Sequence, residues 1–264
     1  MKLTLAMVQM DVALGQPEAN RRKVERLLEK AADRRPDLIL LPEMWNTAYA
    51  LETIQEVADH DGHPTMALMA GLTKKTGANI LAGSVADLRQ GQAYNTAYVF
   101  DRQGRRVAEY SKIHRFRLMD EEKYITAGEE PCTFELDGVN CGLIICYDLR
   151  FPELARTLAL AGAKILFVPS EWPHPRLNHW RTLLVARAIE NQMYVAACNR
   201  VGKKGDTAFF GHSMLVDPWG EIVAEGGEEE EVIYAEIDLA KVEEVRRVMP
   251  VFADRAPGAY ACHN

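Results

Sequence analysis

The chain has 264 residues, of which 48% are hydrophobic and 26% are charged, as in an ordinary globular protein of one large or two small domains. Its formal net charge of −7 and pI of about 5.6 exclude a general electrostatic attraction to nucleic acid or to an anionic membrane. No apolar run approaches the ~18 residues of a membrane span, and no small-residue cleavage site follows the first apolar run, so we expect no signal peptide.

Short apolar runs alternate with amphipathic stretches in the first half of the chain. Residues 3–10 are predicted to form a strand, and Pro17 stands where the first turn of a helix would begin. The next predicted elements are strands at 37–41 and 79–85, a helix at 65–76, and a hairpin of 93–100 and 105–110. Residues 111–128 are predicted to form a long polar loop, and loops longer than ~12 residues usually have a function.

The second half continues this alternation. A hairpin is predicted for 133–136 and 139–145 around Asp137-Gly138, with a helix after it that ends at Ala161. The remaining predicted elements are a helix at 178–192 and strands at 164–168, 194–198, 212–216, 222–224 and 232–237. The acidic run 228–231 is expected to be a solvated hairpin tip.

No linker or change in composition divides the chain. The pattern predicts one α/β domain of mixed strands with helices outside. We place this domain at residues 1–249 and a C-terminal arm at 250–264, where Pro250, Pro257 and Gly258 interrupt any regular structure.

The five cysteines are odd in number and widely spaced, which favours reduced thiols in a cytoplasm over a disulfide framework. No Cys or His pairs have the spacing of zinc ligands, so we expect no metal site. Cys141 lies five residues before Cys146 in the same predicted strand, and an odd separation places it on the opposite face, in the core. Cys132, Cys198 and Cys262 are interpreted as structural or incidental.

Cys146 is the strongest candidate nucleophile. It ends the apolar run 142–145, and a polar, helix-initiating stretch follows it. At the start of a helix, free peptide N–H groups and the helix dipole favour a thiolate and an oxyanion. A lone cysteine is more often a small buried hydrophobe, so the assignment depends on partners elsewhere in the chain.

Two other predicted strands also end at reactive residues, Glu43 and Lys112. Sites gather at the carboxyl ends of strands in open α/β sheets, so we expect Glu43, Lys112 and Cys146 to converge. Cys146 would attack a carbonyl or nitrile carbon, and Glu43 would carry the proton to departing ammonia. Lys112 and the N–H of Tyr147 would stabilise the oxyanion. This chemistry needs no metal and no organic cofactor.

The three segments are Leu-Pro-Glu43, Tyr-Ser-Lys112-Ile-His, and Gly-Leu-Ile-Ile-Cys146-Tyr-Asp-Leu-Arg-Phe-Pro-Glu. They resemble the three signatures of the nitrilase superfamily, the carbon–nitrogen hydrolases. The resemblance covers nearly the whole chain, from Gln9 to the Asp217-Pro-Trp-Gly turn. It implies a four-layer α-β-β-α sandwich that pairs through its helices into a homodimer, α-β-β-α-α-β-β-α. It also implies a C-terminal arm that packs across the partner subunit, and a structural hydrogen-bonding role for His114 in the wall of the site.

The family carries a second glutamate between the lysine and the cysteine. Residues 120–128 match that loop, and the resemblance implies that Glu121 holds Lys112 and helps to position the substrate. Glu122 is the nearest alternative.

Within the superfamily the chain is most similar to the bacterial omega-amidases, including those associated with methionine salvage, on residues 112–124, 170–173 and 186–192. Such enzymes hydrolyse the terminal amide of 2-oxoglutaramate or 2-oxosuccinamate, so the resemblance implies a small-molecule amide substrate. Many relatives have Leu and Asp where this chain has Arg115 and Arg117, a departure that either marks the subfamily or alters the pocket.

Four residues are selected as substrate-binding candidates: Tyr49, Tyr147, Trp172 and Arg117. Tyr49 and Trp172 either line an amide pocket or are ordinary core aromatics. A 2-oxo acid needs a cation for its carboxylate, and the other candidates are Arg150, Arg176 and Arg200. Arg150 has the alternative role of pairing with Glu153 or Asp148.

Two other functions remain as alternatives. Another carbon–nitrogen hydrolase, namely an N-carbamoyl amidohydrolase, a deaminated glutathione amidase or a nitrilase, would share the catalytic residues and differ in the pocket. A catalytically silent ligand-binding subunit is the third possibility, and the intact Glu43, Lys112 and Cys146 argue against it.

Overall fold

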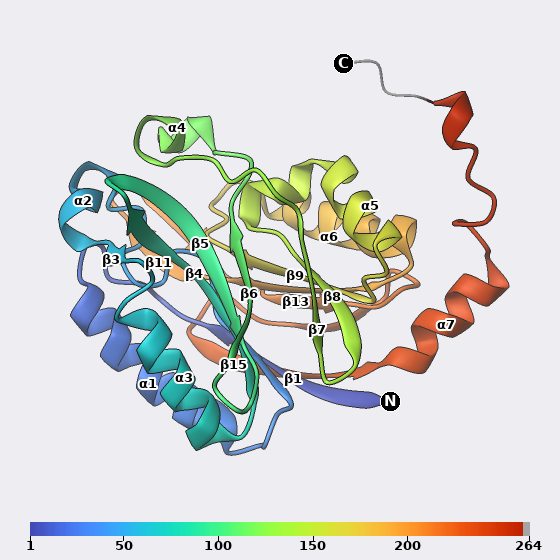
Figure 1. The fold of residues 1–264 in the computed structure, drawn as a ribbon, viewed down its shortest axis with the longest axis horizontal. Helices are drawn as coiled ribbons and strands as arrows, with labels where there is room; N and C mark the ends of the chain where they lie inside the picture. Colours follow the sequence, from blue (N-terminus) through green and yellow to red (C-terminus); the bar gives the residue numbers. More distant parts are fainter. Residues whose placement is uncertain (261–264) are drawn as a thin grey trace.

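The computed structural model describes residues 1–260 and contains two large β-sheets stacked face to face (Figure 1). The strands of the first sheet are β1 (Lys2–Gln9), β2 (Leu38–Leu40), β3 (Asp59–His60), β4 (Asn79–Arg89), β5 (Gln92–Phe100), β6 (Arg106–Ser111) and β15 (Glu231–Asp238). Their order is β15-β1-β2-β4-β5-β6, with β3 paired to β4. The strands β1, β2 and β4 run parallel, whereas β15 and the β4–β5–β6 meander pair antiparallel.

The second sheet has the order β14-β13-β10-β9-β8-β7. Its strands are β7 (Cys132–Leu136), β8 (Val139–Leu143), β9 (Ile165–Ser170), β10 (Tyr194–Asn199), β13 (Met214–Val216) and β14 (Ile222–Glu225). A separate hairpin is formed by β11 (Val201–Lys204) and β12 (Thr207–Phe210). The turn between β7 and β8 has positive φ at both Asp137 and Gly138, as a tight two-residue hairpin requires.

Helices cover the outer face of each sheet (Figure 1). The first sheet carries α1 (Pro17–Ala32) and α3 (Thr65–Thr76), and the second carries α5 (Pro152–Leu160) and α6 (Leu177–Asn191). Successive side chains of β1 point to opposite faces of the first sheet, which explains the layers. Leu3, Leu5 and Met7 enter the core between the sheets. Ala6 and Val8 pack under α1 and α3. The four-layer α-β-β-α sandwich is therefore confirmed.

The remaining helices are short, apart from α7 (Leu239–Val248), which follows β15. The short helices are α2 (Ile54–Val57) and α4 (Glu121–Tyr124), and the 3-10 turns are η1 (Leu51–Thr53), η2 (Arg117–Met119), η3 (Cys146–Arg150) and η4 (Pro257–Ala259). Two of them, η2 and α4, lie inside the stretch 111–128 that was predicted to be loop. They bring Glu121 back towards the end of β6.

Several sequence expectations need correction. Neither α7 nor the β11–β12 hairpin was predicted from the sequence, and β4 extends four residues beyond the predicted strand. The acidic run 228–231 is not a hairpin tip, because β14 and β15 belong to different sheets and the run connects them. The side chain of Gln9 fixes this connection by donating to the carbonyl oxygens of Gly227 and Glu229 at 2.9 and 2.7 Å.

The predicted arm from residue 250 follows α7, and Figure 1 shows it running away from the end of that helix towards the α5 side of the molecule. Phe252 packs against the main core and lies under the guanidinium groups of Arg156 and Arg246. Cys132, Cys141 and Cys198 are buried free thiols, as expected of structural cysteines. Cys262 lies outside the described residues. No helix within residues 1–260 is long and apolar enough to cross a membrane.

Candidate active site

The three predicted catalytic residues follow strand ends and meet between the two sheets. Glu43 comes three residues after β2, Lys112 directly follows β6, and Cys146 comes three residues after β8. All three are buried, and the side chains of Glu43 and Lys112 are fully so. Because β2 and β6 contribute from one sheet and β8 from the other, the site exists only when the sheets are stacked.

The backbone around Glu43 is fixed by an irregular part of β4. Gly83 has a φ of +58°, and a Cβ atom there would stand 2.0 Å from the carbonyl oxygen of Pro42. The next residue, Ser84, donates its N–H to that same oxygen at 3.1 Å, and its hydroxyl accepts from the N–H of Met44 at 3.0 Å. Only glycine permits this close approach, which directs Glu43 inward.

Lys112 is the centre of a buried hydrogen-bond cluster. Its Nζ lies 2.9 Å from Glu43 Oε1 and 2.9 Å from Glu121 Oε2, and it also contacts the Tyr49 hydroxyl at 3.1 Å. Although burial opposes the charge, Glu121 and Glu43 together hold the pKa of Lys112 well above its usual value. Lys112 is therefore a permanent cation.

The two oxygens of Glu43 have different surroundings. Oε1 accepts hydrogen bonds from the Tyr49 hydroxyl, Asn95 Nδ2 and Lys112 Nζ at 2.8, 2.8 and 2.9 Å. Oε2 accepts a single bond, from the peptide N–H of Glu171 at 2.7 Å. Burial favours the protonated acid, yet Lys112 and the other donors keep the pKa of Glu43 below its usual value. Glu43 thus rests as a carboxylate, with Oε2 the oxygen that has spare capacity for a proton.

Glu121 balances the remaining charge of Lys112. It is buried, and it also accepts the N–H of Phe116 at 2.6 Å. Burial raises the pKa of Glu121, with Lys112 acting in the opposite direction. Glu122, the alternative, instead lines a hollow on the far side of Tyr147. The geometry supports the choice of Glu121.

Cys146 occupies a strained position at the first residue of η3. Its φ of +45° is unusual for a residue other than glycine and costs of the order of 1–3 kcal/mol. The buried carboxylate of Asp148 supports this turn by accepting the N–H of Ile145 at 2.9 Å. It also accepts from the N–H of His114 at 2.9 Å and lies 2.8 Å from its Nδ1. His114 therefore makes structural hydrogen bonds, although it lines the hollow on the far side of Tyr147 and not the Cys146 cavity.

The surroundings of Cys146 outweigh the helix start that favours a thiolate. Burial raises the pKa of Cys146 well above its usual value, and the negative charge of Glu43 acts in the same direction. The Asp148 carboxylate already occupies the start of the helical turn, so that turn does not serve to stabilise a thiolate. The resting pair is a neutral thiol beside a carboxylate.

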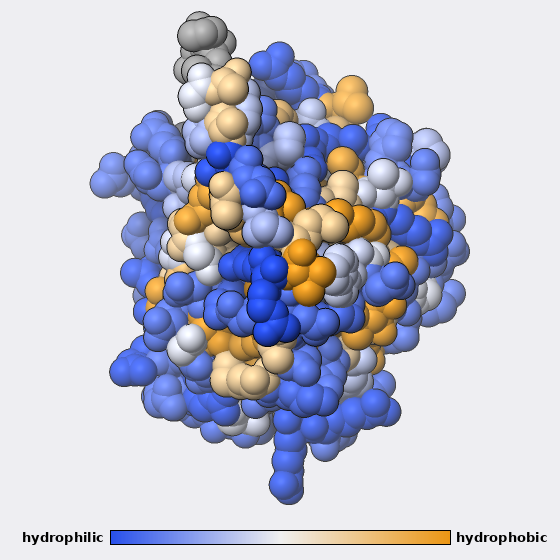
Figure 2. All heavy atoms as spheres, turned by 90° about the vertical axis from the view of Figure 1, so that its right-hand side faces the viewer, coloured by the Kyte–Doolittle hydropathy of each residue, from blue (hydrophilic) through white to orange (hydrophobic). Residues whose placement is uncertain are grey.

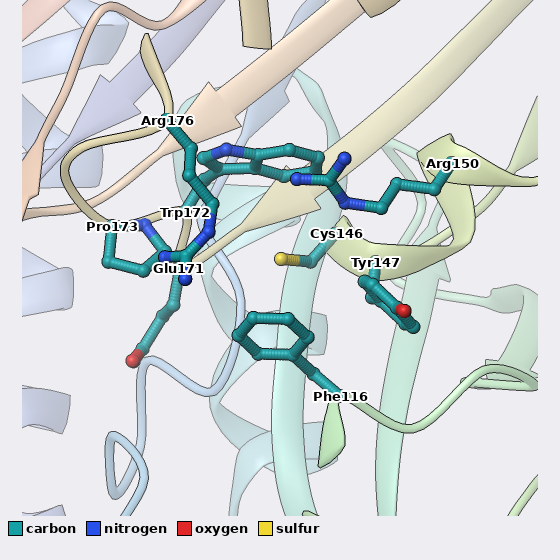
Figure 3. A pocket seen from close by; sticks show the side chains of 8 residues that line it. All are labelled: Phe116, Cys146, Tyr147, Arg150, Glu171, Trp172, Pro173 and Arg176. Carbon is teal, nitrogen blue, oxygen red and sulfur yellow. The ribbon is translucent and has the colours of Figure 1, made fainter. Parts of the chain in front are cut away.

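Cys146 opens onto a narrow cavity of about 10 Å³, roughly the space that one water molecule needs (Figure 3). Its lining residues are Phe116, Cys146, Tyr147, Arg150, Glu171, Trp172, Pro173 and Arg176. A wider hollow of about 420 Å³ shares Phe116, Pro173 and Arg176 with it. A molecule longer than water must therefore displace these shared side chains and extend into the hollow.

The four substrate-binding candidates separate into two groups. Tyr147 and Trp172 line the cavity. Tyr49 does not, because its hydroxyl is used inside the Glu43–Lys112 cluster. Arg117 is exposed and lines the same hollow as Glu122, on the far side of Tyr147.

Two other arginines face the thiol instead. Figure 3 shows the guanidinium groups of Arg150 and Arg176 on either side of the Cys146 sulfur. Arg150 lies over the Trp172 ring at 4.7 Å, not beside Glu153 or Asp148. Within residues 1–260 neither guanidinium forms an ion pair, and their polar contacts are with His179 Nδ1 and the carbonyl of His174, both at 3.4 Å. Arg200 is instead buried against Asp11 at 2.8 Å.

Sequence reasoning missed Asn95, Glu171 and Phe116. Asn95 is a fully buried amide inside β5, and an amide in the middle of a predicted strand was an available signal. Glu171 and Phe116 contact Glu43 and Glu121 through backbone N–H groups, which no sequence pattern marks. In the described part of the chain, no group of three or more His, Cys, Asp or Glu side chains is placed to hold a metal ion.

Comparison with known proteins agrees with this arrangement. The carbon-nitrogen hydrolase family model matches residues 4–247. The chain is 48% identical over 254 residues to the 2-oxoglutaramate amidase of Bacillus subtilis (strain 168), covering 96% of this chain and 98% of that protein. It is 32% identical to the omega-amidase NIT2 of Homo sapiens, covering 97% of this chain and 96% of that protein.

Among solved structures, a CN-hydrolase superfamily protein of Xanthomonas campestris is similar with a TM-score of 0.91 and 31% identity. The match covers 97% of this chain and 98% of that chain. The chain therefore belongs to the carbon-nitrogen hydrolase family, as its three motifs indicated.

Proposed function

We propose that this protein is a cysteine-dependent amidase that hydrolyses the terminal amide of a small 2-oxo acid, 2-oxoglutaramate or 2-oxosuccinamate, to the acid and ammonia. The observation that carries the substrate class is the pair of guanidinium groups, Arg150 and Arg176, beside the Cys146 thiol. Two cations without a carboxylate partner among the described residues favour an anionic ligand. The names of the 2-oxoglutaramate amidase and omega-amidase relatives support the same substrate class.

The position of Arg176 supports a substrate that is longer than its amide group. Arg176 belongs both to the narrow cavity at Cys146 and to the wider hollow beside it. An amide held at the thiol would direct the rest of its chain past Arg176. The carboxylate at the other end would then bind a guanidinium, with Arg150 on the opposite side.

Acylation follows from the resting charges. Cys146 Sγ attacks the amide carbon while Glu43 Oε2 takes the thiol proton. The developing oxyanion receives hydrogen bonds from Lys112 Nζ and from the N–H of Tyr147. Glu43 then gives its proton to the nitrogen, the C–N bond breaks, and ammonia leaves a thioester on Cys146.

Deacylation uses the same groups in the second half of the reaction. Water attacks the thioester carbon while Glu43 Oε2 takes its proton. The tetrahedral intermediate collapses with cleavage of the C–S bond, and Glu43 returns the proton to the sulfur. Throughout, Glu121 holds Lys112 in place through the contact at 2.9 Å.

Ammonia release tests this proposal on 2-oxoglutaramate, 2-oxosuccinamate, an N-carbamoyl amino acid, deaminated glutathione and a simple nitrile. We expect turnover of the two 2-oxo amides and its loss in Cys146→Ala. Activity confined to one of the other compounds would replace the substrate and keep the catalytic residues. No turnover of any compound would favour the ligand-binding subunit.

The carboxylate subsite has its own matched pair of variants. Removing a charge-assisted contact costs about 1.5–3 kcal/mol, so Arg176→Met should raise the KM of the anionic amide substrates about tenfold to a hundredfold. Arg117→Met, outside the cavity, should leave KM unchanged. A raised KM in Arg117→Met with an unchanged KM in Arg176→Met would instead assign binding of the substrate carboxylate to Arg117.

We also propose that the protein is a homodimer paired through its α5 and α6 layer. Leu160, Ile189 and Val248, on α5, α6 and α7, are 45%, 50% and 62% exposed. Figure 2 views the side that carries the C-terminal segment and shows hydrophobic side chains gathered among charged ones.

The odd number and wide spacing of the cysteines support the expected cytoplasmic location.

A further inference from the structure

Glu171 is a buried acid in the wall of the Cys146 cavity that the proposed reaction does not use. It follows β9 directly and is 1% exposed. Its peptide N–H holds Glu43, but its side chain turns elsewhere. Figure 3 shows that side chain leaving the wall beside Phe116, on the side away from Arg150.

The carboxyl group of Glu171 is poorly neutralised. Oε1 lies 3.4 Å from Arg200 Nη1, at the limit of a hydrogen bond, and Oε2 has no hydrogen-bond partner among the described residues. Arg200 is committed elsewhere, because it donates to Asp11 Oδ1 at 2.8 Å and to the carbonyls of Val12 and Val201 at 2.9 and 3.0 Å. A buried carboxylate with so little compensation favours its neutral form.

The charged and titratable groups that face Glu171 come from several elements. They are Glu43 after β2, Tyr49 in the loop that follows it, Arg200 after β10 and Lys204 in β11. Burial raises the pKa of Glu171 to about 8, with Arg200 opposing the shift and Glu43 adding to it. The group is therefore mostly neutral at pH 7 and loses its proton as the pH rises through about 8.

We propose that Glu171 is a specificity residue that, by holding or losing its proton, decides how well the Cys146 cavity accepts a negatively charged molecule. With its proton, the acid leaves the charges of Arg150 and Arg176 free to attract an anion. Without it, a carboxylate in the cavity wall adds to the buried charge of nearby Glu43, in a water-poor site where charges act over several ångströms. Repulsion then weakens anion binding and leaves neutral molecules unaffected. The physiological meaning rests on the proposed anionic substrate, but the charge effect itself does not.

Two thiol reagents of similar size separate this effect from the reactivity of the thiol. Iodoacetate carries a carboxylate where iodoacetamide carries a neutral amide, and both alkylate Cys146. The ratio of their rates cancels the ionisation of the thiol, which is common to both. We expect this ratio in the wild-type protein to fall by about tenfold as the pH rises through 8.

Glu171→Gln copies the neutral acid in nearly the same shape. In this variant the ratio of the iodoacetate rate to the iodoacetamide rate should stay at the low-pH value of the wild type at every pH. The control Glu56→Gln, at an exposed acid, should show the same decrease in this ratio as the wild type. A flat ratio in the wild type, or the same fall in Glu171→Gln, would overturn the proposal.

Steady-state kinetics with 2-oxoglutaramate give a second, independent readout on the same preparations. The KM for 2-oxoglutaramate should rise through pH 8 in the wild type and stay constant in Glu171→Gln. The pH profile of kcat for a neutral amide should be the same in the two proteins. If no 2-oxo amide is hydrolysed, the proposed function fails, yet the alkylation ratio still decides the role of Glu171. A wild-type KM that is constant through pH 8 would count against the proposal.

Discussion

Replacement of Lys112 by methionine tests the charge arrangement of the site most directly. The ammonium lies 2.9 Å from an oxygen of Glu43 and 2.9 Å from one of Glu121, and all three side chains are fully buried. Lys112→Met keeps most of the volume but leaves two buried carboxylates without their shared cation. Breaking a buried ion pair in this way typically costs about 3–5 kcal/mol.

The expected stability loss is large enough to measure. At roughly 2–4 °C per kcal/mol for a domain of this size, Tm at neutral pH should fall by about 10 °C. Equilibrium unfolding in urea at neutral and acidic pH would give the free energies directly. The matched control is Lys123→Met, which removes an exposed lysine from a surface pair with Asp120 and should leave Tm unchanged.

The pH dependence of the loss has a definite sign. Without Lys112, burial and mutual repulsion raise the pKa of both carboxyl groups in the folded variant above the unfolded value of about 4.3. A raised folded pKa gives stability that is fully present below the unfolded pKa and is lost as pH rises through the folded pKa. The deficit of Lys112→Met should therefore shrink on acidification. A variant as stable as the wild type at neutral pH, or a deficit that grows in acid, would refute the charge assignment.

Three further changes follow from the structure. Cys146→Ala should abolish ammonia release with an unchanged circular dichroism spectrum, whereas Cys198→Ala, at a buried thiol outside the cavity, should remain active. Gly83→Ala should cost about 3 kcal/mol and most of kcat, because a Cβ atom would collide with the carbonyl of Pro42 next to Glu43. Gly77→Ala, with a similar φ but open space, should leave kcat intact and thereby isolate the collision. Ile189→Glu should yield a monomer in light scattering, whereas the control Val107→Glu, on β6, should remain a dimer. A monomeric wild-type protein would refute the proposed homodimer.

The convergence of the three proposed catalytic residues was predictable because each stands in a local motif. Glu43, Lys112 and Cys146 all follow apolar strands, and the topology then brings those strand ends together. The layers of the fold were also predictable, because apolar side chains on both faces of β1 indicate that the strand is covered on both sides. Even α7 left a signal, with Leu239, Val242 and Val245 at helical spacing after the N-cap Asp238.

The surroundings of the site were not predictable from local patterns. Arg117 and Arg176 are equally plausible cations in the sequence, and only the path of the chain through η2 and the loop before α6 separates them. The helix-start argument at Cys146 omitted the desolvation and the carboxylate that folding places beside the thiol. Both points depend on long-range geometry.

The single under-used oxygen of Glu43 sets the order of events in the proposed reaction. Its Oε2 accepts one hydrogen bond, from the N–H of Glu171, and is the oxygen left for proton transfer. Because that oxygen serves both the departing ammonia and the incoming water, the two must occupy the same place in turn. Until ammonia escapes, it can only re-attack the thioester and restore the amide. Added ammonia should then compete with water for the acyl-enzyme, so the reverse reaction acts as a built-in brake when nitrogen is abundant.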